Sequence, residues 1–216
     1  MGMAFLKKLI QYGTTSTEIS AQGTPNGEAL NAPGVAPYEE VTRRGLSFHI
    51  ITTTATASVV APGTTTAAVG IFNTAADGGK SIILDALFAI NKVGHATLGQ
   101  SGLICVLGQT RVVALGGVLV VRKNNGYGAG ADTVADVKAG GAILDSVTGV
   151  AIGWIPVGPT VNMSVVSLPG CVLFAPINGR LIIPPGRQFG IDVMSSNVEN
   201  TWLVGAMWHE AVLLLG

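Results

Sequence analysis

Two glycine-containing motifs share residues with nucleotide-binding loops. Gly79-Lys80-Ser81 matches the end of a phosphate-binding loop, which holds phosphates at a helix start. That loop needs a glycine five residues before Gly79, where Thr74 stands, and an alternating, strand-like pattern follows Ser81. Gly126-Tyr127-Gly128-Ala129-Gly130 lacks the spacing of a dinucleotide loop and has no βαβ unit around it. We therefore predict that both motifs are turns or surface loops.

The three histidines could supply acid–base or metal-binding chemistry, but their spacing sets them apart. His49, His95 and His209 form no i, i+2 or i, i+4 pair of the kind that binds a metal. His209 and Glu210 are neighbours on a predicted strand, where adjacent side chains point to opposite faces. The 12 acidic residues are mostly scattered, and although a glycosidase-type carboxylate pair stays open, nothing points to one. We predict no catalytic residues, no metal site and no cofactor, and thus a protein that is not an enzyme.

The two cysteines, Cys105 and Cys171, could in principle form a disulfide. Met1–Ile10 contains the pair Lys7-Lys8 but no apolar segment after it, so we see no signal peptide. We therefore expect a protein made in a cytoplasm, where thiols stay reduced. Both cysteines lie in apolar strand contexts and are expected to act as small hydrophobic residues.

The segments that would position these residues have the signals of β-strands. From Leu46 onward, short apolar runs rich in β-branched residues are separated by glycine and proline turns. The predicted strands are Leu46–Thr54, Ala67–Phe72, Ile82–Ile90, Leu103–Leu107, Arg111–Val121, Ala142–Leu144, Ala151–Ile155, Val161–Leu168, Cys171–Phe174, Arg180–Ile183, Phe189–Met194 and Thr201–Leu215. One short helix is predicted at Thr133–Lys138, capped by Asp132. The pattern predicts an all-β, jelly-roll-like sandwich of two sheets.

Two strands alternate clearly enough for their faces to be predicted. In the first, one face carries Ile82, Leu84, Ala86, Phe88 and Ile90, while Asp85 and Asn91 lie on the other. In the last strand, Trp202, Val204, Ala206 and Trp208 share a face.

The chain changes character near residue 45, which divides it into an N-terminal arm, 1–45, and a sandwich domain, 46–216. Residues 14–37 are rich in Thr, Ser, Gly, Asn and Pro and have no sustained apolar period. Four apolar residues mark the tip of the arm: Phe5, Leu6, Leu9 and Ile10. We predict that this tip anchors the arm on a neighbouring molecule, the alternative being a tail without a role.

The composition favours a protein that packs against other subunits. Charged residues make up 11% of the chain, against about 25% in an average soluble domain, and the mean hydropathy is +0.53. A formal net charge of zero and the lack of a basic stripe argue against nucleic acid binding. Apolar stretches broken by proline argue against a membrane span. The shortage of charge predicts a surface that is covered in a homo-oligomer.

The C-terminal segment resembles the last strands of small jelly-roll proteins. Arg180–Asn197 reads as an apolar strand, a Pro-Gly turn and a second apolar strand, and Thr201–Glu210 is a final strand with Trp-x-Glu at its end. The chain is similar in style to virion structural proteins of tailed bacteriophages, especially capsid decoration or cement subunits with an N-terminal arm. This resemblance implies a virion location, other virion proteins such as the major capsid protein as partners, and a homo-oligomer, for which we expect a trimer. The alternative is a receptor- or carbohydrate-binding jelly roll of a phage tail or fibre, in which Tyr127 would be an exposed loop aromatic.

Overall fold

The computed structural model describes residues 7–12, 15–20, 38–63, 65–94, 99–108, 117–143, 153–163 and 171–213. The chain divides into two compact units, residues 1–37 and 38–216. In the first unit, β1 (Lys7–Tyr12) and β2 (Thr15–Ser20) form an antiparallel hairpin within the segment predicted to be an arm. The second unit begins with α1 (Glu39–Arg43). Within the described residues, no helix has the length and apolar character needed to cross a membrane.

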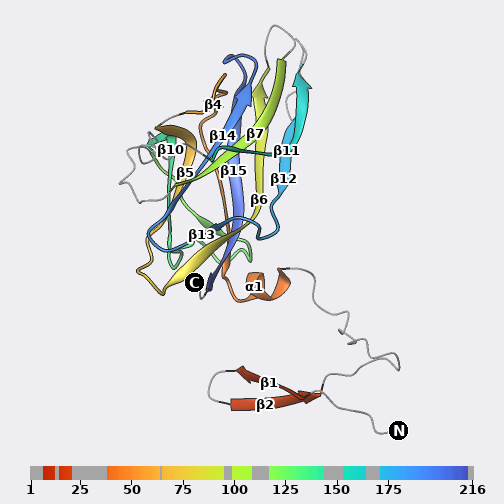
Figure 1. The fold of residues 1–216 in the computed structure, drawn as a ribbon, viewed down its shortest axis with the longest axis vertical. Helices are drawn as coiled ribbons and strands as arrows, with labels where there is room; N and C mark the ends of the chain where they lie inside the picture. Colours follow the sequence, from red (N-terminus) through yellow and green to blue (C-terminus); the bar gives the residue numbers. More distant parts are fainter. Residues whose placement is uncertain are drawn as a thin grey trace, which may run out of the picture. The chain divides into compact units, whose positions relative to one another are not determined.

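The second unit consists of two antiparallel sheets packed as a sandwich, which confirms the predicted fold class (Figure 1). The seven-stranded sheet contains β3 (Ser47–Ile51), β4 (Thr56–Ala57), β6 (Lys80–Val93), β9 (Arg122–Lys123), β12 (Val172–Pro176), β13 (Ile182–Ile183) and β15 (Thr201–Val212). The six-stranded sheet contains β5 (Thr66–Asn73), β7 (Gly99–Gly108), β8 (Gly117–Val118), β10 (Ala135–Ile143), β11 (Ile155–Met163) and β14 (Gln188–Ser195).

Eight of the described strands pair in the order of a jelly roll. The first pairs with the last, β3 with β15, and the second with the seventh, β5 with β14. The third pairs with the sixth, β6 with β12, and the fourth with the fifth, β7 with β11. Such pairing results when one long hairpin is rolled into two sheets. Strands β10 and β8 extend the six-stranded sheet beside β5.

The core lies between the two sheets and contains the predicted apolar face of the last strand. Trp202, Val204, Ala206 and Trp208 are all at most 1% exposed, which confirms that they share a face and shows that this face points into the core. The ring of Trp208 stacks on Phe48 of β3 with a centroid separation of 6.1 Å. Because β15 lies between β6 and β3, its inward residues contribute to the middle of the core (Figure 1).

The predicted face of β6 is wrong beyond Leu84. Leu84 pairs with Trp208 and Ala86 with Met207, so Asp85 is an extra residue, a β-bulge, in β6. The bulge reverses the alternation: Ile82 and Leu84 point into the core, and after Asp85 the core residues are Leu87 and Ala89. Phe88 and Ile90 are therefore turned to the outer face of the sheet, where they are only partly buried.

The helix predicted at Thr133–Lys138 is also wrong, because most of this segment belongs to β10. Ala135 and Val137 are buried against the core, while Asp136 and Lys138 form an ion pair of 3.1 Å between them. This two-residue alternation and the pairing with β5 outweigh the helix-capping signal of Asp132.

Other predicted strands are found with changed ends. The segment Arg111–Val121 is described only from residue 117, where β8 has two residues. Strand β11 spans Ile155–Met163 and contains the end of the predicted strand Ala151–Ile155 and the start of the predicted strand Val161–Leu168. The remaining residues of Val161–Leu168 lie outside the described residues.

Candidate functional site

Two of the three histidines lie within hydrogen-bond distance of a polar side chain. His49 Nδ1 lies 2.6 Å from Asn124 Oδ1, and His209 Nδ1 lies 2.8 Å from Asp85 Oδ1. The Tyr38 ring packs on His209 with a centroid separation of 5.7 Å. His95 lies outside the described residues. The part of the chain that the structure describes contains no group of three or more His, Cys, Asp or Glu side chains able to hold a metal.

Glu210 is a fully buried carboxylate that joins the two sheets. Its Oε1 accepts hydrogen bonds from the hydroxyl of Thr133 and, at 3.0 Å, from the N–H of Val134. Its Oε2 lies 3.6 Å from Lys80 Nζ. His209, beside it, is part-buried on the other face of β15, as predicted from alternation. Glu210 thus ties the last strand of one sheet to the start of β10 in the other.

Burial raises the pKa values of two groups, Asp192 and Cys105. Burial raises the pKa of the Asp192 carboxyl to about 6, although hydrogen bonds from the N–H groups of Val193 and Ala68 oppose this effect. Burial also raises the pKa of the Cys105 thiol to about 12. Cys105 lies in the core, and Cys171, half-buried beside β12, is not bonded to it. The Cys105 thiol is therefore a poor nucleophile, because the thiolate is the reactive form and a raised pKa keeps the thiol protonated.

The two glycine motifs occupy turns, as predicted. Gly79 is followed directly by β6, a strand, so it has no helix N-terminus to offer a phosphate. Tyr127 is 84% exposed between the left-handed glycines Gly126 and Gly128. Of the predicted anchor residues, Leu9 and Ile10 lie in β1, whereas Phe5 and Leu6 lie outside the described residues.

The outer face of the seven-stranded sheet carries side chains that the sequence analysis did not identify as a site. Seven apolar residues from four neighbouring strands point away from the core there, and we call them the outer apolar face: Ile51, Phe88, Ile90, Val172, Phe174, Leu203 and Met207. Four of them are 38–51% exposed: Ile51, Val172, Phe174 and Met207.

Strand register arranges these residues in adjacent rows. One row runs Phe174, Phe88, Gly205 and Ile51 across β12, β6, β15 and β3. The next row runs Val172, Ile90 and Leu203. None of these residues is charged. A soluble sandwich that exposed this face to water would normally carry polar side chains at alternate positions.

Gly205 is the one residue in the first row without a side chain, and the packing requires this. A Cβ atom at Gly205 would lie 2.4 Å from the Phe88 ring and 2.5 Å from the backbone oxygen of Ile50. The Phe88 ring therefore lies over the Gly205 backbone. This contact fills the row and keeps the outer apolar face continuous across β6 and β15.

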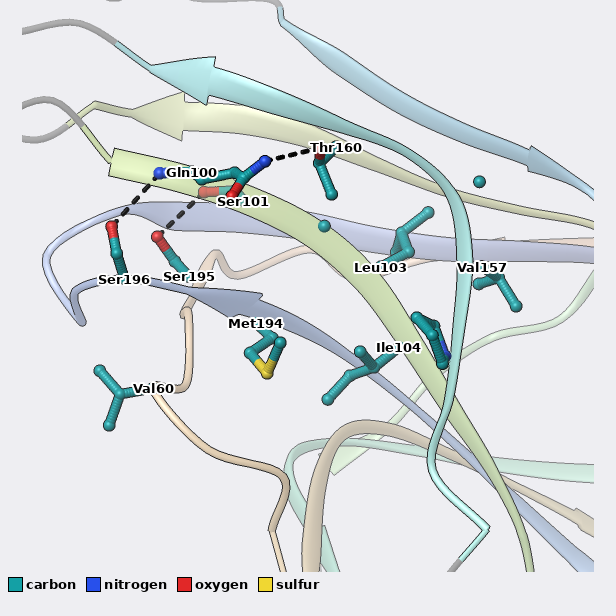
Figure 2. A pocket seen from close by; sticks show the side chains of 13 residues that line it. Val60, Gln100, Ser101, Leu103, Ile104, Val157, Thr160, Met194, Ser195 and Ser196 are labelled. Carbon is teal, nitrogen blue, oxygen red and sulfur yellow. Dashed lines mark hydrogen bonds between the residues drawn. The ribbon is translucent and has the colours of Figure 1, made fainter.

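A pocket of about 270 Å³ lies on the six-stranded sheet, between Val60 and the edge strand β11 (Figure 2). Gln100 spans its polar end: its Nε2 donates to Thr160 Oγ1 at 3.0 Å, and its backbone N–H donates to Ser196 Oγ at 3.2 Å. The apolar side of the pocket includes Ile104 and Met194. None of the described residues that line it is charged, so this lining fits a neutral group.

Comparison of the chain with models of protein families, with curated protein sequences and with solved structures finds no match.

Proposed function

We propose that this protein is a structural assembly subunit, of the capsid decoration or cement kind, that stabilises a virus particle by packing against neighbouring subunits. The observation that carries this proposal is the outer apolar face. Its two rows, which cross four and three strands, contain no charged residue, and the chain is short of charge overall. Contiguous apolar patches on soluble proteins commonly mark interaction sites. Jelly rolls are frequent in capsid proteins, which is an analogy of fold and not of site.

The size of the face sets the strength of the contact. At about 200 Å² for a large apolar side chain, the exposed parts of Ile51, Val172, Phe174 and Met207 together measure roughly 350 Å². At about 25 cal/mol per Å², full burial contributes roughly 9 kcal/mol, while association costs about 4–15 kcal/mol. A single contact is therefore weak. A subunit that makes several contacts at once, as in a trimer on a particle, binds firmly.

The N-terminal segment adds a second contact in this proposal. Residues 1–37 form a unit separate from the sandwich. An arm that reaches a neighbour would fasten subunits together while each sandwich keeps its own core. In this assembly the partners are other copies of the chain and other virion proteins, and the subunit requires no cofactor and carries out no reaction.

The test is binding of the full-length protein to particles that lack it. Met207→Lys places a charge in the outer apolar face, whereas Tyr127→Lys places one in an exposed loop. We expect Met207→Lys to reduce particle binding at least ten-fold and Tyr127→Lys to leave it unchanged, with both variants giving the wild-type far-UV spectrum. Equal binding by the two folded variants would contradict the proposal.

One observation favours a second candidate, a ligand-binding jelly roll of a tail or fibre. The pocket of Figure 2 offers hydroxyl and amide groups at one end and an apolar side at the other, as sites for neutral ligands do. Titration with neutral monosaccharides, followed by NMR, would shift the amide signals of Gln100 and Thr160 if this candidate holds. No shift up to millimolar ligand would exclude simple sugars.

A further inference from the structure

We propose that the outer apolar face binds the N-terminal hairpin, residues 7–20, of a second copy of this chain. The proposal rests on the proposed function, because it names the partner of the same face. Its starting point is that the molecule contains two features that each need covering. One is an apolar sheet face, and the other is a hairpin to which no third strand is paired among the residues that the structure describes.

The hairpin needs a surface to pack on. Its two strands have six residues each, and a two-stranded hairpin is at best marginally stable in water. The register pairs Lys8 with Ile19, Ile10 with Thr17, and Tyr12 with Thr15. Because residues two apart on a strand share a face, these six residues define one face of the hairpin.

The two faces of the hairpin differ in polarity. The face just defined contains the apolar or aromatic residues Ile10, Tyr12 and Ile19 together with two threonines. The opposite face holds Leu9 among polar and charged residues: Lys7, Gln11, Ser16, Glu18 and Ser20. Docking through the first face turns the face that contains Lys7 and Glu18 away from the sheet. Lys8 lies near the open end of the hairpin.

The dimensions of the two surfaces correspond. A six-residue strand is about 20 Å long, and four strands spaced about 4.8 Å apart cover roughly 15 Å between the outermost axes. The exposed apolar area, roughly 350 Å² as estimated above from about 200 Å² per large side chain, is well below the about 800 Å² per partner of a standard interface. It is too small for two sandwiches to pair on and suits a two-stranded ribbon.

The segment between the hairpin and the sandwich is long enough for the hairpin of one copy to reach the sandwich of another. Residues 21–37 number 17, and such a segment can span at most about 60 Å. This reach exceeds the width of the face itself, so a hairpin can extend to an adjacent subunit. In a closed trimer each subunit would then give one hairpin and receive one, which is a heterologous contact that closes a ring.

A cysteine cross-link between two different chains tests the proposal. Both full-length proteins carry Cys171→Ser, while Cys105 stays, buried and with a pKa of about 12. One chain carries Ile10→Cys and the other Met207→Cys, and the two are mixed and oxidised. We expect a disulfide-linked dimer with one chain of each kind. The control is Gln11→Cys, from the opposite hairpin face, which should cross-link to Met207→Cys at least ten-fold less.

The outcomes separate this proposal from the proposed function. Cross-linking with Ile10→Cys well above the Gln11→Cys control supports hairpin docking in a neighbour. Equal yields from the two positions, or no mixed dimer at all, overturn it. A disulfide within a single Ile10→Cys/Met207→Cys chain, without any between chains, overturns the exchange between copies. The proposed function is judged separately, by the effect of Met207→Lys on particle binding.

Discussion

Replacing Asp192 with asparagine should stabilise the protein at neutral pH and have little effect in acid. Asp192 lies in β14 and is 3% exposed, and burial raises its pKa from 3.8 to about 6. In the unfolded chain this carboxyl releases its proton near its ordinary pKa of about 3.9. Between those two values the unfolded chain has lost the proton and the native protein still holds it. The contribution of Asp192 to stability is therefore complete below about pH 4 and is lost as the pH rises to about 6.

The size of the effect follows from that difference in pKa. A pKa difference of one unit corresponds to about 1.4 kcal/mol, so the free energy of unfolding is about 3 kcal/mol lower above pH 6 than it is in acid. The amide side chain of the Asp192→Asn variant would be neutral at every pH, and its Oδ1 can still accept the hydrogen bond that the Val193 N–H donates at 2.8 Å. Any cost of placing the amide group is the same at all pH values, so the change with pH isolates the titration.

Urea unfolding at pH 3.5 and pH 7.5 measures this effect. The free energy of unfolding of Asp192→Asn, minus that of the wild type, should be about 3 kcal/mol larger at pH 7.5 than at pH 3.5, so the variant gains stability relative to the wild type. All other titrating groups are shared by the two proteins and cancel. A difference that is the same at both pH values would show that the Asp192 carboxyl is already ionised and solvated in the native protein, which would refute the reasoning.

Three further predictions concern the packing. Gly205→Ala should lower the free energy of unfolding by about 2 kcal/mol or more, because the new Cβ atom would clash with the Phe88 ring and the Ile50 backbone oxygen. The control Gly153→Ala adds a Cβ atom in open space and should change the free energy of unfolding by less than about 0.5 kcal/mol, as measured by urea denaturation. Glu210→Ala removes the acceptor of the Thr133 hydroxyl and the Val134 N–H, so it should lower the free energy of unfolding by about 3–5 kcal/mol. The control Glu40→Ala changes an exposed carboxylate and should lower it by under about 1 kcal/mol, with thermal melting as the measurement for both. Cys105 and Cys171 should both react with a thiol reagent after denaturation without reductant; a protein in which neither reacts would contain a disulfide.

The fold class could be predicted from the sequence because the strongest signals are local. In β15, large apolar residues alternate over Trp202–Trp208, and the Pro184-Pro185-Gly186 turn separates two apolar strands. These patterns depend on the residues themselves and survive in the structure. The helix expected at Thr133–Lys138 failed for the opposite reason. Its capping signal is local, while the pairing of β10 with β5 and the bonds from Glu210 come from distant parts of the chain.

The candidate site was missed because of one bulge. A strict alternation assigned Phe88 and Ile90 to the same face as Leu84, whereas the extra residue Asp85 turns them to the opposite, outer face. One signal was present in the sequence. In β15 the residues between the core positions include Leu203 and Met207, so both faces of this strand are apolar. Apolar residues on both faces of a strand are typical of a strand that is covered on both sides. This pattern in β15 could have pointed to the outer apolar face.

The molar mass of the full-length protein in solution tests the central claim most directly. Light scattering at micromolar concentration should give an oligomer for the wild type, for which we expect three chains. It should also give an oligomer for Tyr127→Lys, which alters an exposed loop. Phe174→Lys, which charges the first row of the outer apolar face, should give a folded monomer. A monomeric wild type, or a folded Phe174→Lys protein with the mass of the wild-type oligomer, would contradict assembly through this face.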